Sequence, residues 1–393
     1  MHQFCTACRR MAPWQFQPFC DCGGMIDVDY DIDQVTLRDS PNPYVRFADL
    51  LPIMAAHDRL PADARFTPTL HATRLGRHLA LPNLYLKVET GLPTCSTKDR
   101  MAAVSLAFLW ECGVRDFCTS STGNSSTAYA YAIRAYPGMH LSLFTAERFM
   151  PRLAHADHHQ ITHFGLRDAS FVEAFAFAGD YARAKGLTAE RGFFNPGRRE
   201  GLKLAFLEAS DQIDAPIDWY VQAVSSGMGV YGCYKAAGEL RRLKRTDRLP
   251  RTLCVQQESC APMANAFAEG SAVIEPRHIV PDPTGIAAAI LRGNPTRAYP
   301  VVRRIVVESG GGFVAVSEQD IREARRMVED LEGVSPCFSA ATALAGLVKQ
   351  IGADDFPRQD TILVNLTGGD RPDAPPPGAI TWMRRAGDTW CAE

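Results

Sequence analysis

A lysine that stands where a loop becomes a helix can act as an amine nucleophile, and Lys98 occupies such a position. It ends a small polar segment, residues 92–98, and an apolar stretch expected to form a buried helix follows at residues 101–110. An amine shielded by packed structure can lose its proton and attack a carbonyl group. A lone lysine at a helix start is more often a solvated charge, so chemistry at Lys98 needs support from elsewhere in the chain.

Three later segments supply turns of the kind that a small anionic, ring-shaped ligand would need. Residues 120–126 (SSTGNSS) form a hydroxyl-rich turn before a helix, and residues 224–230 (VSSGMGV) join an apolar strand to another helix. Residues 365–370 (NLTGGD) end a third strand. Small residues at a helix N-terminus let backbone N–H groups point at a phosphate. Each turn alone is typical of an ordinary cap or strand-to-helix connection, but with Lys98 the three predict one site.

On these motifs, residues 66–370 resemble the fold type II family of pyridoxal-phosphate enzymes, which includes threonine synthase and cysteine synthase. The N-terminal cysteines, residues 46–52 (RFADLLP) and residues 363–369 (LVNLTGG) are most similar to cysteate synthase, which acts on phosphoserine and sulfite. The resemblance implies an α/β fold with two parallel-sheet domains of the tryptophan synthase β-like kind. A small N-terminal zinc-ribbon-like segment would precede them.

Strand–helix alternation after Lys98 independently favours a parallel sheet. The expected domains are a cysteine knuckle (1–30), a large cofactor domain (31–97 and 197–393) and a small mobile α/β domain (98–196). The proline-rich tail from Arg371 is expected to wrap the surface.

The resemblance also implies roles for single residues. Lys98 would hold the aldehyde carbon of the cofactor as an imine and then carry the α-proton of the substrate. Asn124 would hydrogen-bond the ring hydroxyl, and Thr367 would face the pyridine nitrogen. A neutral hydroxyl there leaves a weaker electron sink, which favours elimination and replacement over racemisation or transamination. The cofactor phosphate would be held by Ser225, Ser226, Gly227, Met228 and Gly229.

Two positions depart from the family pattern. Thr97 stands where many relatives have an aromatic residue, and Met228 stands where relatives usually have glycine. Thr97 leaves more room beside Lys98, and Met228 makes the phosphate turn less tight than in relatives.

The substrate is expected to bind the hydroxyl-rich turn. Its carboxylate would meet Ser121, Thr122 and Ser125 at a helix N-terminus. A phosphate leaving group would need a cation, and Arg100 is the leading candidate because it lies two residues past Lys98. The other candidate cations are Arg152, Arg198, Arg199 and Lys203.

Four N-terminal cysteines have the spacing of a metal knuckle: Cys5 and Cys8, then Cys20 and Cys22. Four thiolates can close a tetrahedral zinc site that leaves no open position, so a zinc ion here would be structural. The second pair is Cys-x-Cys, tighter than the usual Cys-x-x-Cys, and two glycines after it could let the chain turn back under the ion. The alternative is a knuckle that holds no metal.

Composition limits the partners and the compartment. The chain has 393 residues, 46% of them apolar and 22% charged, with a net charge of −2. This balance does not favour nucleic acid or an anionic membrane as partner. Twelve cysteines without a signal-peptide pattern indicate reduced thiols in the cytoplasm. The family resemblance further implies a homodimer.

Several functions compete. The leading hypothesis is β-replacement on an activated serine, giving cysteate from O-phosphoserine and sulfite. Alternatives with the same cofactor are a threonine synthase reaction on O-phosphohomoserine, or β-replacement or elimination that makes a non-standard amino acid. An inactive zinc-knuckle binding module is the rival of a different class. A nicotinamide-binding protein is disfavoured because no G-x-G-x-x-G follows an early strand.

Overall fold

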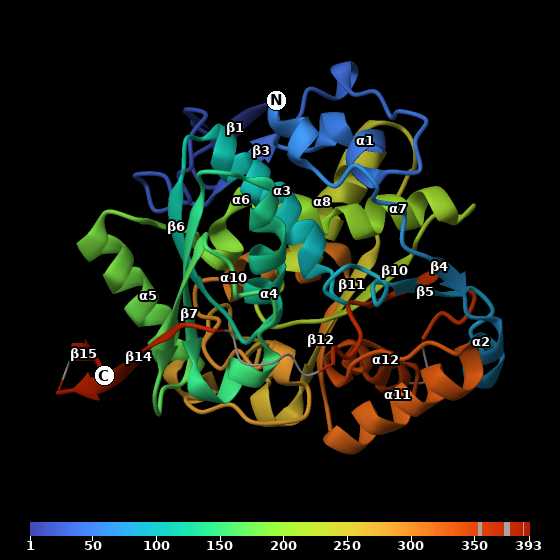
Figure 1. Ribbon diagram of the computed structural model, residues 1–393. Coiled ribbons are helices and arrows are strands. Elements are labelled where there is room, and N and C mark those ends of the chain that lie inside the picture. Colours follow the sequence, from blue (N-terminus) through green and yellow to red (C-terminus); the bar gives the residue numbers. More distant parts are fainter. Residues whose placement is uncertain (353–355, 373–377, 388) are drawn as a thin grey trace. The chain divides into compact units, whose positions relative to one another are not determined.

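The computed structural model describes residues 1–352, 356–372, 378–387 and 389–393. The chain divides into two compact units, each made of separate stretches of sequence (Figure 1). Unit 1 comprises residues 1–65, 98–201 and 371–393, and unit 2 comprises residues 66–97 and 202–370.

Unit 2 is built on a six-stranded sheet in the order β12-β11-β10-β13-β5-β4. Every pairing is parallel except that of the edge strand β4 with β5. The central strands β10 and β13 are buried along their whole length, as expected for a parallel sheet covered on both faces. The strands are β4 (Thr69–His71), β5 (Leu84–Val88), β10 (Trp219–Ala223), β11 (Arg251–Gln257), β12 (Gly312–Val316) and β13 (Ile362–Leu366).

The helices of unit 2 cover this sheet. The apolar helix α12 packs on β10, β11, β12 and β13 and is buried along most of its length. The strongly amphipathic α11 packs on α12, with its start fixed by the expected capping box of Ser317 and Asp320 and its end at Gly333. The helices are α2 (Thr73–Leu79), α7 (Leu204–Gln212), α8 (Met228–Arg242), α9 (Pro262–Ala268), α10 (Tyr299–Ser309), α11 (Glu318–Glu332) and α12 (Phe338–Ile351).

Unit 1 contains a second six-stranded sheet, in the order β15-β14-β8-β7-β6-β9. Its pairings are parallel except for the terminal hairpin of β14 and β15. Helix α5 packs on β6, β7 and β9 through its alanine face. The strands are β6 (Asp116–Ser120), β7 (His140–Ala146), β8 (Ile161–Leu166), β9 (Thr188–Ala189), β14 (Ile380–Ala386) and β15 (Thr389–Ala392).

Three helices of unit 1 carry predicted site residues. Helix α3 starts at Lys98 and is buried through most of its length, α4 packs against it, and α6 lies next in sequence to β9. The helices are α1 (Pro43–Arg46), α3 (Lys98–Glu111), α4 (Asn124–Ala132), α5 (Phe171–Lys185) and α6 (Pro196–Leu202).

A small antiparallel sheet stands at the N-terminus of unit 1, in the order β2-β1-β3. Its strands are β1 (His2–Cys5), β2 (Met11–Ala12) and β3 (Ile26–Asp29). Residues 31–65 follow as short helical turns.

The unit boundaries differ from the predicted domains at both ends of the chain. Residues 31–65 belong with unit 1 because the carboxylate of Glu111 in α3 accepts the backbone N–H groups of Met54, Ala55 and Ala56. The prediction of a surface-wrapping tail was wrong, because β14 extends the sheet of unit 1 by pairing with β8. The residues of β14 follow a proline run and show only a weak alternation of apolar and polar side chains, so their pattern did not predict a core strand.

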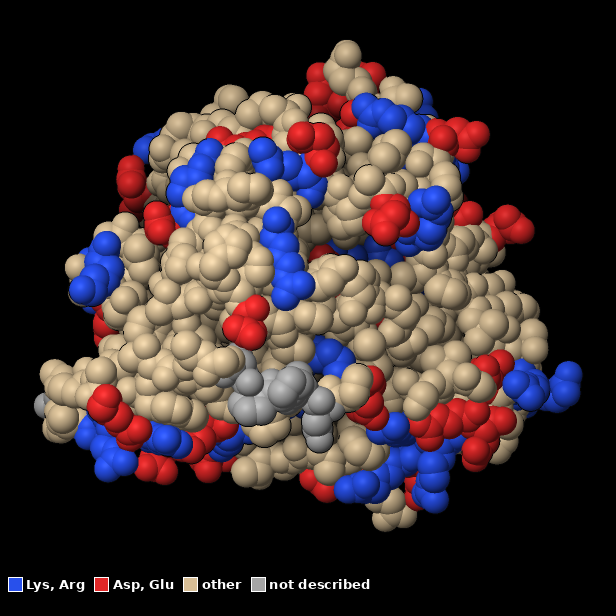
Figure 2. All heavy atoms as spheres, in the orientation of Figure 1, with Lys and Arg blue, Asp and Glu red and all other residues tan. Residues whose placement is uncertain are grey.

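Charged side chains of both signs are interspersed over the face drawn in Figure 2, in keeping with a net charge of −2. Of the helices in the described residues, none combines the length and apolar character needed to cross a membrane.

Candidate active site

Lys98 is the first residue of α3, and its side chain is only partly exposed. Burial, together with the nearby Arg198 guanidinium, lowers the pKa of its amine to about 7. An amine with this pKa is about half uncharged at pH 7, whereas an exposed lysine is almost wholly protonated. The structure therefore gives Lys98 the property that a nucleophilic or proton-carrying lysine needs.

A buried ion pair lies beside Lys98 in unit 1. Arg198 Nη1 donates to Glu190 Oε1 at 2.5 Å, and Arg198 Nη2 donates to Ser125 Oγ at 2.8 Å. Burial opposes the charge of Arg198, but the Glu190 carboxylate outweighs burial and raises the pKa of the guanidinium. Glu190 also accepts from Thr119 Oγ1 at 2.7 Å. This pair holds one of the predicted substrate hydroxyls, and the sequence analysis did not identify Glu190.

The hydroxyl-rich turn between β6 and α4 is organised by Ser121. Its Oγ accepts the backbone N–H groups of Gly123 at 3.1 Å and Ser126 at 3.0 Å. Arg152 lies against this turn and donates from Nε to the carbonyl oxygen of Thr122 at 2.8 Å. Asn124, predicted to meet the cofactor ring, is the first residue of α4 and is partly exposed. Unit 1 thus brings the turn, Lys98 and two arginines into one region.

Unit 2 places the other predicted residues at the carboxyl ends of neighbouring parallel strands. Thr367 follows β13, and β13 pairs on one side with β5 and on the other with β10. The loop after β5 leads to Lys98, and its last residue, Thr97, donates its N–H to the Thr367 carbonyl oxygen at 2.9 Å. The loop is fixed further by Gly369, which donates to the Cys95 carbonyl oxygen at 3.0 Å. Ligands of open α/β sheets bind at this edge.

The turn after β10 has the form of an anion-binding site. Gly227 has φ of +74°, and a Cβ there would lie 2.6 Å from the Val302 side chain, so only glycine fits without strain. Gly227, the N-cap residue of α8, has no side chain that could cap the first N–H groups of this helix. Ser225 and Ser226 precede this helix start, and Met228 is buried as its first residue. Hydroxyls and unsatisfied N–H groups at a helix start suit a phosphate dianion.

A buried polar network supports this edge of the sheet, and the sequence analysis missed it. Asn365 Nδ2 donates to the Tyr220 hydroxyl at 2.8 Å, and that hydroxyl donates to Gln222 Oε1 at 2.5 Å. The Gln222 side chain lies against Gly229, where a Cβ would be 2.5 Å from its Nε2. Asn365 Oδ1 is buried without a hydrogen-bond partner among the described residues. These residues stand on adjacent strands, so no local sequence pattern could have linked them.

The five candidate cations for a substrate phosphate differ in their burial and in their hydrogen-bond partners. Arg199 pairs with Asp27 in unit 1, and Lys203 pairs with Glu239 in unit 2, both fully buried. Arg198 is held by Glu190. Arg100 is buried in α3, and its assignment to substrate stays a prediction. Arg152 lies at the hydroxyl-rich turn.

The fold and these residues define the class of protein. The chain belongs to the family of pyridoxal-phosphate dependent enzymes, and the family pattern matches residues 62–368. Among curated relatives, threonine synthase of Methanosarcina acetivorans is 30% identical over 88% of this chain and 85% of its own length. Cysteate synthase of the same organism is 28% identical over 93% of this chain and 91% of its own. Among solved structures, maize serine racemase superposes with a TM-score of 0.66 at 19% identity, covering 81% of this chain and 92% of that one. The prediction of a fold type II pyridoxal-phosphate enzyme is confirmed.

The residues present fit pyridoxal phosphate. The uncapped start of α8, with Gly227 in the left-handed conformation, would take the phosphate. Thr367 offers a neutral hydroxyl at a strand end, and Lys98 offers an amine that is about half uncharged at pH 7. The roles of these residues toward the cofactor remain predictions.

Proposed function

We propose that the chain catalyses β-replacement on an activated serine, converting O-phosphoserine and sulfite into cysteate and phosphate. The proposal depends on one observation above all, the partly buried amine of Lys98 with its pKa of about 7. Family membership supports a pyridoxal-phosphate dependent synthase or lyase. The relatives named cysteate synthase match 93% of the chain, which supports this choice of substrate and nucleophile.

The cofactor supplies an aldehyde that binds the substrate amine and an electron sink that makes the α-proton acidic. Lys98 Nζ then takes the α-proton from the substrate and later returns it, since an amine of pKa about 7 can do both near neutral pH. The β-carbon loses its bond to the phosphate oxygen and gains a bond to the sulfur of sulfite. Ser121, Thr122 and Ser125 hold the substrate carboxylate, and Arg198 holds Ser125 in place.

In place of the predicted Arg100, which is buried in α3, we assign the phosphate leaving group to Arg152, which is partly exposed. Arg199 and Lys203 are each paired with a buried carboxylate, whereas Arg152 lies at the turn that would hold the substrate carboxylate. Arg371 adds a second cation there, donating from Nη2 to the Arg152 carbonyl oxygen at 2.7 Å.

Arg152→Gln tests this assignment. Loss of a charge-assisted hydrogen bond should lower kcat/KM for O-phosphoserine by about 10- to 100-fold. An O-acetylserine substrate, whose leaving group is not a dianion, should be affected much less. Arg148→Gln is the matched control, because Arg148 is an exposed arginine four residues earlier. Equal losses with both substrates would assign Arg152 to the fold rather than to the phosphate.

The decisive experiment for the reaction is a product assay on the enzyme loaded with pyridoxal phosphate. O-phosphoserine and O-phosphohomoserine are each offered with sulfite, with sulfide or with no added nucleophile. Cysteate with one equivalent of phosphate is the expected product. Threonine from O-phosphohomoserine would instead establish the alternative, which the threonine synthase relative at 30% identity favours. Pyruvate from O-phosphoserine would indicate elimination.

Covalent labelling separates the enzyme from an inactive binding module. Borohydride should fix the bound cofactor to Lys98 in the wild-type chain. Lys98→Ala should abolish fixation and lower turnover by at least about 1000-fold, the upper part of the usual range for a positioned acid–base group. Lys185→Ala, at the exposed end of α5, should change neither. If the wild-type protein bound no cofactor, the hypothesis of an inactive binding module would be favoured over that of an enzyme.

A further inference from the structure

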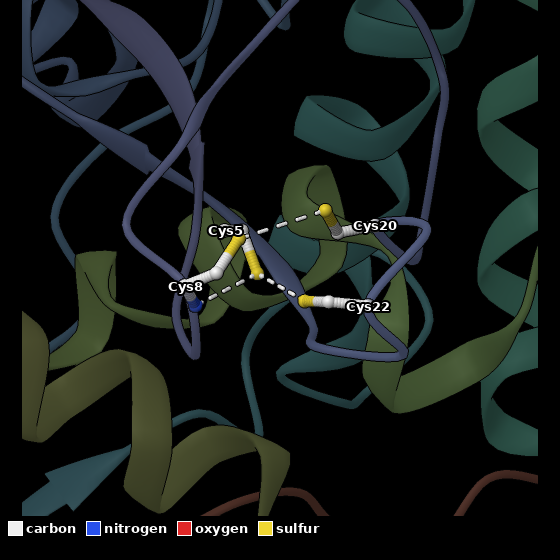
Figure 3. Close-up of side chains that lie close together, drawn as sticks. All are labelled: Cys5, Cys8, Cys20 and Cys22. Atoms are coloured by element: carbon white, nitrogen blue, oxygen red, sulfur yellow. Dashed lines mark hydrogen bonds between the residues drawn. The ribbon is translucent and has the colours of Figure 1, made fainter.

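Four cysteine sulfurs converge at the N-terminal sheet of unit 1 (Figure 3). Cys5 is the last residue of β1 and Cys8 lies in the turn after it, whereas Cys20 and Cys22 come from the segment before β3. All four sulfurs lie within 4.8 Å of one another, with 3.5 Å between Cys5 and Cys22 and 3.9 Å between Cys8 and Cys20. All four cysteines are free, and a disulfide would need sulfurs about 2.0 Å apart.

These distances suit one ion. Two zinc–sulfur bonds of about 2.3 Å at a tetrahedral angle place their sulfurs about 3.8 Å apart. The backbone is shaped to the same arrangement, since a Cβ at Gly24 would lie 2.5 Å from Cys5 Sγ. The Cys8 N–H points at Cys5 Sγ at 3.5 Å, as amides around thiolate ligands do. The Cys-x-Cys spacing of the second pair is therefore accommodated by a glycine turn.

The three-stranded N-terminal sheet is too small to bury much apolar surface, so a bound ion would add more to its stability than to that of a large sheet. The small sheet has three strands of four, two and four residues. Segments shorter than about 40 residues seldom bury enough apolar surface to hold their fold without a metal, a disulfide or a partner.

The sheet is also tied to α6, which carries Arg198. Arg199 Nη2 donates to the Ile26 carbonyl oxygen of β3 at 2.6 Å. The hydroxyl of Tyr30, just after β3, donates to Glu200 Oε2 at 2.7 Å, and both bonds are buried. Ile26 pairs directly with Cys5 across the sheet. One turn of α6 thus faces the cysteine sheet through Arg199 and Glu200 and faces Ser125 through Arg198.

We propose that Cys5, Cys8, Cys20 and Cys22 bind one zinc ion, and that this ion holds β1 and β3 in the shape that positions α6. The ion is structural, because four protein ligands leave no coordination position for substrate. Its effect reaches Arg198, a positioning residue that acts through Ser125 and Lys98 and does not touch the reacting atoms.

The first test is metal content. Elemental analysis of the purified wild-type protein should find one zinc per chain, and titration of its thiols with a mercurial should release that zinc. Cys8→Ser and Cys20→Ser should reduce zinc to near zero, whereas Cys391→Ser, an exposed cysteine of β15, should keep one. A wild-type chain without zinc, or with iron in its place, would overturn the proposal, as would full zinc in Cys8→Ser.

The second test is hydrogen exchange on the zinc-depleted wild-type chain, which avoids any variant that fails to fold. Exchange should increase in β1, β3 and α6, while α12 of unit 2 should keep its protection. Faster exchange in β1 and β3 with no change in α6 would overturn the link to the active site. Neither test involves turnover, so a different substrate or a failed product assay would leave both results interpretable.

Discussion

At the scale of single residues, the pKa of Lys98 makes a prediction about pH. The protonated amine cannot attack an aldehyde, so the rate at which the cofactor-free enzyme captures pyridoxal phosphate should rise up to about pH 7 and then level off. If Lys98 had the ordinary lysine pKa, the rate of cofactor capture would keep rising up to about pH 10. The measurement is stopped-flow absorbance across a pH series. A rate that still climbs steeply above pH 8 would contradict the lowered pKa.

The lowered pKa of Lys98 also makes the stability of the folded chain depend on pH. The direction follows from whether the folded or the unfolded chain binds more protons. Because the folded pKa of Lys98 is lower than the unfolded one, the unfolded chain binds more protons between about pH 7 and 10.5. The contribution of Lys98 to the stability of the cofactor-free protein therefore increases with pH across this window and is least favourable below pH 7.

Arg198 and Glu190 give a direct way to move this pKa. The double variant Arg198→Gln/Glu190→Gln removes both charges, keeps the side-chain shape at position 190 and leaves neither ion alone in a buried site. Without the guanidinium, the pKa of Lys98 should rise, and the inflection of the capture rate should shift to higher pH. If the inflection stays in place, burial alone sets the pKa. Glu190 could not be found from the sequence, because only the fold brings it to Arg198.

At the scale of secondary-structure elements, the start of α8 carries the next prediction. Gly227→Ala forces a left-handed residue and a clash with Val302, at a cost of about 1–3 kcal/mol. The cofactor phosphate should then bind at least about 10-fold more weakly, which corresponds to about 1.4 kcal/mol. Titration of the cofactor-free protein with pyridoxal phosphate measures the change.

Gly238→Ala is the matched control on the same helix. No atom outside its local backbone lies within 4 Å of a Cβ there, and alanine should stabilise the helix by up to about 1 kcal/mol. Equal affinities for the two variants would show that the Gly227 turn does not hold the phosphate.

Two helices, α11 and α5, carry complete local signals in the sequence. The capping box at Ser317 and the glycine at Gly333 mark both ends of α11. An equal capping box of Ser170 and Glu173 opens α5, so this missed helix could have been found. By contrast, the supporting network of Tyr220, Gln222 and Asn365 depends on strand neighbours that are far apart in sequence.

At the scale of the whole molecule, family patterns predicted the two α/β units but not how the ends of the chain are assigned to them. The family match ends at residue 368, so the tail had no template and only a weak strand pattern. The homodimer and the mobility of residues 98–196 stay predictions. Light scattering coupled to size-exclusion chromatography checks the first, where a monomer at micromolar concentration would contradict it.

The tail supplies the last prediction, because it completes the sheet of unit 1. Strand β14 pairs with β8 from His163 to Leu166, Met383 is part of the apolar core, and Trp382 lies under the Arg167 guanidinium at 3.6 Å. Deletion of residues 378–393 would expose the edge of β8 and remove this packing. Burial of Met383 alone is worth about 1.5–3 kcal/mol, so the deletion should lower the melting temperature of unit 1 clearly and increase aggregation.

Point variants on β14 distinguish packing from simple shortening of the chain. Met383→Ala should reproduce much of the loss, whereas Thr381→Ala, at an exposed position of the same strand, should not. Limited proteolysis followed by mass spectrometry should show new cleavage within residues 161–185 in the deletion and in Met383→Ala, while the core strands of unit 2 stay protected. If the variant that lacks residues 378–393 had the same melting temperature and protease resistance as the full chain, β14 would add nothing to the stability of the sheet. Because β8 lies next to β7, and β7 next to β6, whose end carries the Ser121 turn, destabilisation of this edge should also weaken substrate binding.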